Sequence, residues 1–355
     1  MYPALAVLQA LGNENMTVLW VGAERGMEAE LVQRQGVPFT TIPAAGVHGV
    51  GLSALPGNVI KLTRGILASR RVLREFQPDV LLFTGGYVAA PMAVAGRKIP
   101  ALLYSPDIEP GMALKFLARF ASTIAVTTEE SRAHFSTGSR VEVTGYPTRP
   151  DLSRHSRAEA RASLNLAANL PVLLVTGGSK GARSINRAVA ANLNELLKVA
   201  QVLHLTGNLD WPEIQAFQAT LTPEQSGRYH AHPYLHDMGA ALASADLVLS
   251  RAGASVLGEY PLFGLPAVLV PYPYAWRYQK VNADYLVERG AARLITDEQL
   301  PAQLTPAITE LFAQPEILDN MRAAMKSLAR PDASQRLAGL VRELAERSPR
   351  KGIAR

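Results

Sequence analysis

Residues 249–283, LSRAGASVLGEYPLFGLPAVLVPYPYAWRYQKVNA, decide the fold class of this chain. The stretch opens at the end of an apolar strand, turns through the small residues RAGAS, and continues as a helix that carries Glu259 about one turn in. The tripeptide GLP ends that helix, and 267–270 forms a second buried strand. This order predicts a doubly wound α/β domain, in which ligands bind beyond the carboxyl ends of parallel strands.

Several residues of this stretch have the chemistry of a nucleotide-sugar site. Gly253 and Ala254 are small enough to let a ligand approach the backbone, and the helix N-terminus behind them favours phosphate. Glu259 could accept hydrogen bonds from two adjacent ribose hydroxyls, and Gln279 and Asn282 follow the next strand at the same edge of the sheet. The alternative is an ordinary turn between a strand and a helix, with a glutamate on the surface.

Composition limits the function classes. The 355 residues suffice for two domains of ordinary size, and 48% hydrophobic residues can bury a large core. The absence of cysteine excludes disulfides and thiolate metal sites, and no apolar run reaches the roughly 18 residues of a membrane span. The net charge of +6 favours an anionic lipid or a phosphorylated substrate over nucleic acid, because no nucleic-acid motif is present. The same charge also fits an ordinary soluble surface.

A second glycine-rich turn follows the apolar strand over 172–176. The sequence GGSKGA, residues 177–182, then opens a helix over 184–197. Glycines and a hydroxyl at a helix N-terminus present backbone N–H groups and the positive end of the helix dipole, which together favour phosphate. The turn matches neither GxxxxGK[ST] nor GxGxxG. No metal constellation accompanies it, because the seven histidines are scattered and the nearest group, His230, His232 and His236, fits a loop or surface role better.

The N-terminal half repeats the same alternation of strand and helix. The strand over 78–83 ends in TGGY, whose Gly85, Gly86 and Tyr87 suit close approach of a ligand to the backbone. The strand over 101–104 is followed by SPDIEPG, in which Asp107 and Glu109 could act as a base or a sugar ligand, or only as solvated caps. The sequence GYPTRP then breaks regular structure and predicts a linker between two domains.

A helix over 59–76 carries basic and apolar residues in alternation. Lys61, Arg64, Arg70, Arg71 and Arg74 lie among isoleucines and leucines, a pattern typical of helices at anionic membrane surfaces. The alternative is a packed helix of the domain with a solvated basic face. The N-terminus itself, MYPALAVLQAL, predicts an amphipathic helix with a proline in its first turn.

Together these segments resemble the MurG-type N-acetylglucosaminyltransferases of glycosyltransferase family 28. The matching segments follow the order of the family over nearly the whole chain: YPALAVLQAL, WVGAERGMEAELV, QPDVLLFTGGYVAAP, VTGYPTR, VTGGSKGARSIN, YLHDM, RAGAS with the later glutamate, GLPAVLVPYP with QxxNA, and PDAS. The resemblance implies the GT-B architecture, in which two Rossmann-like doubly wound domains face a cleft.

The domain boundaries that we expect follow from this resemblance and from the linker. Residues 1–148 would form the acceptor and membrane domain, and 149–330 the domain that binds UDP-GlcNAc. A helix over 331–347, capped by Asp332 or Ser334, would pack back on the first domain, and 348–355 would be a basic tail.

The activity that the resemblance implies is the inverting, metal-independent transfer of GlcNAc from UDP-GlcNAc, without a cofactor, to the C4 hydroxyl of undecaprenyl-pyrophosphoryl-MurNAc-pentapeptide (lipid I). The product is lipid II of peptidoglycan synthesis, and the enzyme acts peripherally on the cytoplasmic face of the cell membrane. The implied contacts are Ser179 to the diphosphate, Arg149 and the Leu235 backbone to uracil, Glu259 to ribose, the Ala254 backbone, Gln279 and Asp107 to GlcNAc, and Gly85, Gly86 and Tyr87 to the acceptor diphosphate.

The chain also departs from the family pattern. The family begins with a strand and GGTGGHxxPAL, whereas this sequence starts two residues before that proline, so we expect a misassigned start that omits the loop and its histidine. The general base is then unknown, with Asp107 as one candidate. YSPD replaces the HEQN-like segment, and Val256 and Tyr278 replace a usual Thr and Gln. Alternatives are therefore a transferase for another lipid such as diacylglycerol, a nucleotide-sugar-binding protein with impaired catalysis, and a UDP-GlcNAc 2-epimerase.

Overall fold

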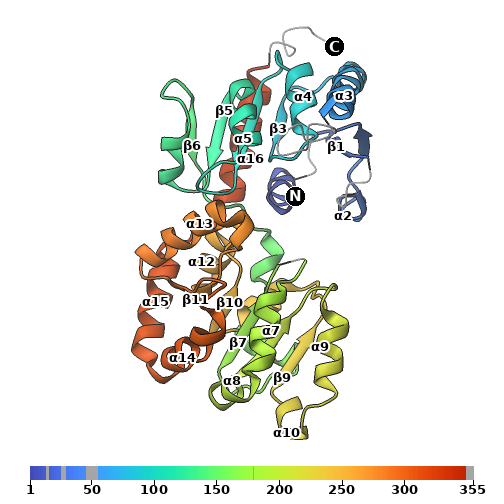
Figure 1. Ribbon diagram of the computed structural model, residues 1–355. Coiled ribbons are helices and arrows are strands. Elements are labelled where there is room, and N and C mark those ends of the chain that lie inside the picture. Colours follow the sequence, from blue (N-terminus) through green and yellow to red (C-terminus); the bar gives the residue numbers. More distant parts are fainter. Residues whose placement is uncertain (13–15, 25–28, 45–54, 179, 349–355) are drawn as a thin grey trace. The chain divides into compact units, whose positions relative to one another are not determined.

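The computed structural model describes residues 1–12, 16–24, 29–44, 55–178 and 180–348 (Figure 1). The chain divides into two compact units. The first consists of Met1–Arg149 together with Asp332–Arg355, and the second of Pro150–Pro331. The last segment of the chain therefore returns to the first unit.

The first unit contains two parallel sheets. The smaller pairs β1 with β2, and the larger has the order β3-β4-β5-β6. The strands are β1 (Trp20–Ala23), β2 (Phe39–Ile42), β3 (Leu81–Phe83), β4 (Ala101–Ser105), β5 (Thr123–Val126) and β6 (Val141–Val143). The helices are α1 (Tyr2–Leu11), α2 (Ala29–Gln33), α3 (Leu55–Phe76), α4 (Ala89–Ala95), α5 (Met112–Leu117), η2 (Ala118–Phe120), η3 (Glu129–His134) and α16 (Ala333–Glu346).

Both faces of the larger sheet in this unit are covered by helices. Alternate residues of β4 face opposite ways, because side chains alternate along a strand. Leu103 belongs to a cluster with buried residues of α3, α4 and α5, whereas Leu102 and Tyr104 belong to another with α1 and α16. Two-sided burial explains why β4 and β5 are apolar almost throughout.

The second unit contains one parallel sheet of six strands in the order β12-β11-β10-β7-β8-β9. The strands are β7 (Val172–Thr176), β8 (Gln201–Leu205), β9 (Tyr229–His232), β10 (Leu247–Ser250), β11 (Ala267–Leu269) and β12 (Ala292–Leu294). The helices are η4 (Pro150–Ser153), α6 (Arg157–Ser163), α7 (Arg183–Ala191), α8 (Leu193–Val199), α9 (Trp211–Gln218), α10 (Pro223–Ser226), α11 (Met238–Ser244), η5 (Ala254–Leu257), α12 (Glu259–Phe263), η6 (Pro273–Ala275), α13 (Trp276–Glu288), α14 (Leu300–Ala313) and α15 (Pro315–Ser327).

Helix α16 packs against α1 and β4 within the first unit (Figure 1). Leu337 is fully buried beside Val7 of α1. Asp332 is the N-cap residue of this helix, one of the two predicted, but its side chain makes no capping hydrogen bond. Asp332 instead accepts a hydrogen bond at Oδ2 from Arg336 Nε at 2.6 Å, and Ser334 Oγ donates to the carbonyl of Thr148 at 2.8 Å.

Other elements differ from the predictions in their bounds. The helix expected over 184–197 is two helices, α7 and α8, separated at Asn192. Helices α9 and α10 lie in a stretch for which the sequence analysis assigned no helix. Helix α3 begins at Leu55, four residues before its predicted start. In the part of the chain that the structure describes, no helix combines the length and the apolar character that crossing a membrane requires.

Candidate functional site

The strand order places a switch point between β7 and β10. From β7 the chain moves outward through β8 and β9, and from β10 it moves outward on the other side through β11 and β12. The loops that leave the two central strands therefore diverge, and ligands of such sheets bind in the crevice between them. Thr176 pairs with Ser250 at the carboxyl ends of these strands, so the candidate site lies just beyond this pair.

The loop after β7 depends on glycine. Gly178 and Gly181 have φ values of 84° and 76°. A Cβ on Gly181 would lie 2.1 Å from the carbonyl oxygen of Thr206, whereas a Cβ on Gly178 would meet nothing within 4 Å. Packing therefore requires Gly181, while the space beside Gly178 is open to a ligand. Ser179, which the resemblance assigns to the diphosphate, lies outside the described residues.

Helix α7 begins directly after this loop. Its N-cap residue, Ala182, offers no side-chain cap. The first N–H groups of a helix have no partner within it, and they lie at the positive end of the helix dipole. The loop and the first turn of α7 can therefore bind a phosphate through backbone donors.

The loop after β10 leaves room for a ligand as well. Gly253 has an ordinary negative φ of −66°, and a Cβ there would meet nothing within 4 Å. The protein's own packing does not require glycine at this position, which is consistent with an approaching ligand. Ala254 begins the 3-10 turn η5, and Glu259 is the first residue of α12. The single helix expected here is therefore a 3-10 turn followed by a short α-helix.

Gln279 and Asn282 both lie in α13, but they differ in role. Gln279 Oε1 accepts a hydrogen bond from the backbone N–H of Tyr272 at 2.9 Å, so this oxygen already has a partner within the protein. Asn282 is fully buried, and its Nδ2 donates to the carbonyl of Ala252 at 3.2 Å. Asn282 thus supports the loop after β10 from behind and does not face the ligand space.

The turn after β9 is held by a group of ionic side chains. Leu235 is half-buried in this turn, and Asp237 caps α11 by accepting from the N–H of Ala240 at 3.2 Å. Asp237 Oδ2 also accepts from Arg154 and His155, each at 2.7 Å. Burial opposes the charge on Asp237, but these hydrogen bonds outweigh it and lower its pKa to about 2.

Arg251 has a role that the sequence analysis did not identify. Its guanidinium group donates to Ser184 of α7 and to Asp297, which follows β12. It also donates to the carbonyl of Val270 at the end of β11 and lies 5.3 Å from the ring centroid of Tyr272. The pattern RAGAS marked the position as part of a small-residue turn, but only the fold brings these partners together.

A buried polar chain lies behind the same loops. Asn186 of α7 donates to the Thr206 carbonyl at 2.8 Å and to Asp210 Oδ2 at 2.9 Å, and its Oδ1 lies 2.9 Å from His204 Nε2. His204 Nδ1 lies 2.8 Å from the hydroxyl of Tyr229. Complete burial lowers the pKa of His204 to about 3, so the imidazole is neutral.

The acceptor candidates of the first unit follow β3. Gly85 and Gly86 have φ values of 101° and 89°, so this turn uses conformations that other residues avoid. Tyr87 is 65% exposed. These residues lie at the carboxyl edge of the β3-β4-β5-β6 sheet, where a ligand of this unit would bind.

The segment after β4 is tightly fixed. The hydroxyl of the buried Tyr104 lies 2.9 Å from Thr127 Oγ1, and Thr127 Oγ1 lies 2.8 Å from the carbonyl of Pro106. Burial raises the pKa of Tyr104 well above its usual range. Asp107 is half-buried and Glu109 is buried, 3.9 Å from Lys115 Nζ. Both carboxylates therefore sit in an ordered segment, and neither is a solvated surface group.

Arg149 lies at the last position of the N-terminal segment of the first unit. Its guanidinium carbon is 5.4 Å from the ring centroid of Tyr2, a distance typical of a cation–π interaction. The side chain thus contacts α1 within its own unit. Its predicted role toward uracil stays a prediction.

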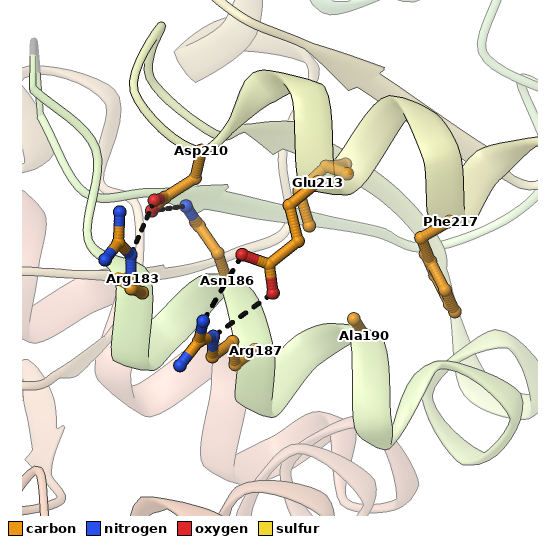
Figure 2. A pocket seen from close by; sticks show the side chains of 8 residues that line it. Arg183, Asn186, Arg187, Ala190, Asp210, Glu213 and Phe217 are labelled. Carbon is orange, nitrogen blue, oxygen red and sulfur yellow. Dashed lines mark hydrogen bonds and ion pairs between the residues drawn. The ribbon is translucent and has the colours of Figure 1, made fainter.

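A cavity of about 250 Å³ lies between α7 and α9 (Figure 2). Figure 2 shows that its charged side chains point toward one another: Arg183 pairs with Asp210 at 2.8 Å, and Arg187 with Glu213 at 3.1 Å. The cavity therefore offers no unpaired charge to a ligand among the residues that line it. Within the described residues, no group of three or more His, Cys, Asp or Glu could hold a metal ion.

Comparisons with known proteins agree with this arrangement. Residues 1–126 match the model of the glycosyltransferase family 28 N-terminal domain, and 172–337 match that of the family 28 C-terminal domain. The UDP-N-acetylglucosamine–N-acetylmuramyl-(pentapeptide) pyrophosphoryl-undecaprenol N-acetylglucosamine transferase of Roseiflexus sp. is 38% identical over 98% of this chain and 92% of its own. The protein of the same name from Desulforudis audaxviator is also 38% identical, over 98% and 96%.

Among solved structures, the MurG protein of Acinetobacter baumannii superposes with a TM-score of 0.75 and 27% identity, over 96% of this chain and 95% of that one. The strand order, the glycine-rich loops and these matches lead to one assignment. The chain belongs to glycosyltransferase family 28, among the MurG-type N-acetylglucosaminyltransferases, and it has two Rossmann-like domains of the GT-B fold.

Proposed function

We propose that this chain transfers GlcNAc from UDP-GlcNAc to the C4 hydroxyl of lipid I, with inversion, to give lipid II. The observation that carries the proposal is the pair of open glycine positions, Gly178 and Gly253, on the two loops that flank the switch point of the second unit. The relatives named above, which match nearly the whole chain, supply the identity of the two substrates.

The donor would bind to the second unit. Backbone N–H groups of the loop after β7, with Ser179, would hold the diphosphate, and Glu259 would accept from the ribose hydroxyls. The Leu235 backbone would serve uracil, and the Ala254 backbone and Gln279 would contact GlcNAc. Arg149 and Asp107, which the resemblance also assigns to the donor, belong to the first unit, and their roles stay predictions. Donors that are already oriented stabilise the charge that develops on the departing UDP. The chemistry that remains is removal of the proton from the acceptor hydroxyl, which needs a general base.

The acceptor would bind to the first unit, with its diphosphate at Gly85, Gly86 and Tyr87. One face of α3 would rest on anionic lipid at the cytoplasmic face of the membrane. Ile60 and Leu67 are 60% and 58% exposed and lie seven residues apart on this helix, with exposed basic residues between and beyond them. Apolar side chains surrounded by basic ones suit the interface of an anionic bilayer. A packed helix with a solvated basic face is the alternative.

The test is the transfer of labelled GlcNAc from UDP-GlcNAc to a short-chain lipid I analogue, with diacylglycerol vesicles as the competing acceptor. We expect labelled product only with the lipid I analogue. Product only with diacylglycerol would favour the related lipid glycosyltransferase, and no product with either, despite bound UDP-GlcNAc, would favour a binding role.

The variant Glu259→Gln tests the donor assignment in the same assay. The substitution weakens two hydrogen bonds to a charged acceptor, so we expect kcat/KM for UDP-GlcNAc to fall about 10- to 100-fold. Glu213→Gln, whose carboxylate pairs with Arg187 on the surface, is the matched control and should leave kcat/KM unchanged. Equal values for both variants would contradict the ribose role.

A further inference from the structure

Arg251 connects the loops on both sides of the switch point. Its Nη2 donates to Ser184 Oγ at 2.8 Å, in the first turn of α7. Its Nη1 donates to Asp297 Oδ1 at 2.5 Å and to the carbonyl of Val270 at 3.1 Å. Ser184 Oγ donates in turn to the same Asp297 oxygen at 2.9 Å, so three side chains form a closed triangle.

This triangle, Arg251, Ser184 and Asp297, is largely shielded from solvent. The Arg251 side chain is only 10% exposed and that of Asp297 23%. Ion pairs with so little exposure are screened less by salt than surface pairs, and a guanidinium group offers its donors in a rigid planar fork. The triangle can therefore fix the distance between the elements from which its members come: α7, the loop after β10 and the segment after β12.

We propose that Arg251 is a positioning residue for the diphosphate of the nucleotide sugar. It holds the first turn of α7 against the loop that begins after Ser250. The backbone donors of this turn and of this loop are then in a fixed arrangement before the ligand arrives, which avoids the cost of ordering them on binding. The inference rests on the proposed function, because it concerns the same UDP-GlcNAc site.

The chain offers a matched control at the opposite end of β10. Arg161 is 8% exposed and donates to the carbonyls of Ser244 and Ala168 and to Asp246 Oδ2. Two arginines of similar burial thus brace the same central strand, one before it and one after it. Only Arg251 lies at the carboxyl edge of the sheet, where the ligand loops begin. Substitution of either arginine should therefore lower stability, but only substitution of Arg251 should weaken ligand binding.

The experiment measures the dissociation constants of UDP and of uridine by titration calorimetry, for the full chain and for Arg251→Lys, Ser184→Ala and Arg161→Lys. Lysine keeps the charge but loses the planar fork. We expect Arg251→Lys to weaken UDP binding about tenfold, the loss of roughly one charge-assisted hydrogen bond, and uridine binding less than about twofold. Ser184→Ala should also weaken UDP binding, by about threefold. This variant tests the inference if Arg251→Lys does not fold. Arg161→Lys should lower the melting temperature and leave both affinities unchanged.

Three outcomes would overturn the positioning role while leaving the proposed function intact. The first is UDP affinity that Arg251→Lys and Ser184→Ala leave unchanged. The second is an equal loss of affinity for UDP and for uridine, and the third is an equal loss of UDP affinity in Arg161→Lys, because either would reflect general destabilisation of the unit. A full chain that binds no UDP at all would instead contradict the proposed function and this inference together.

Discussion

Gly181 lies where the loop after β7 meets the loop after β8 backbone to backbone. Its φ of 76° and the 2.1 Å between its hypothetical Cβ and the Thr206 carbonyl both exclude a side chain. We expect Gly181→Ala to lower the free energy of unfolding by about 3 kcal/mol or more, because conformational strain and a backbone clash add. Gly290→Ala, with a φ of 69° but nothing within 4 Å, should cost only about 1 kcal/mol in the same urea titration. If both variants lost a similar free energy of unfolding, the clash at Gly181 would be relieved by a movement of the loop.

Asp237 gives the turn after β9 a dependence on pH. Its folded-state pKa of about 2 lies below the roughly 3.9 of an unfolded aspartate. The charged form therefore stabilises the folded state above about pH 4, and this contribution is lost as the pH falls toward 2. The variant Asp237→Asn keeps a capping side chain but cannot be charged.

The expected result is a stability difference between the wild type and Asp237→Asn that is constant above about pH 5 and shrinks below pH 4. Urea unfolding curves over this range measure it, and titrations of groups that do not contact Asp237 cancel in the difference. A difference that grew with acidity would mean that another group controls the turn.

At the scale of single residues, the sequence predicted the glycines better than the charged groups. The glycine-rich turn was predicted directly after the strand over 172–176, and the structure places it there because glycines that follow an apolar run are a local signal. Arg251 could not, because Ser184 and Asp297 lie 67 and 46 residues away in the sequence and meet it only after the sheet forms.

At the scale of elements, strands were predicted more closely than helices. The bounds of β7 match the prediction and those of β4 differ from it by one residue, because buried parallel strands are uninterrupted apolar runs. Helices α9 and α10 were missed although local signals mark them: Pro212 near the start of α9, and the capping box of Thr222 and Gln225 at α10. Of the two predicted caps of α16, Asp332 is the N-cap residue, whereas Ser334 lies within the helix and its Oγ donates to the carbonyl of Thr148, a distant residue of the same unit.

The packing of helix α16 on the first unit can be tested at Leu337. Leu337 is fully buried against α1 and the sheet of the first unit. We expect Leu337→Ala to leave a cavity and to lower the stability of the first unit by about 2–5 kcal/mol, whereas Leu340→Ala on the half-buried side of α16 should cost less. Calorimetric scans should show the transition of the first unit shifted and that of the second unchanged. A shift of both would mean that the two units unfold together.

At the scale of the whole molecule, the charge is unevenly divided. The first unit holds 20 of the 36 Lys and Arg and 14 of the 30 Asp and Glu, so it carries the entire net charge of +6, and the second unit is neutral. Several of these basic residues surround the exposed Ile60 and Leu67 of α3. The unit proposed to bind a lipid-linked acceptor is thus the one whose net charge favours anionic surfaces.

This asymmetry predicts selective binding to anionic vesicles. Each basic residue near such a surface contributes about 1 kcal/mol and each buried apolar side chain adds to it, so Arg64→Glu and Leu67→Glu should each weaken vesicle binding about tenfold or more. Lys198→Glu on α8 makes the same charge change in the second unit and should have little effect. Co-sedimentation with vesicles of anionic or zwitterionic lipid, at 50 and 500 mM salt, measures this. Equal losses for Arg64→Glu and Lys198→Glu would assign the attraction to net charge alone, and α3 would then be an ordinary solvated helix.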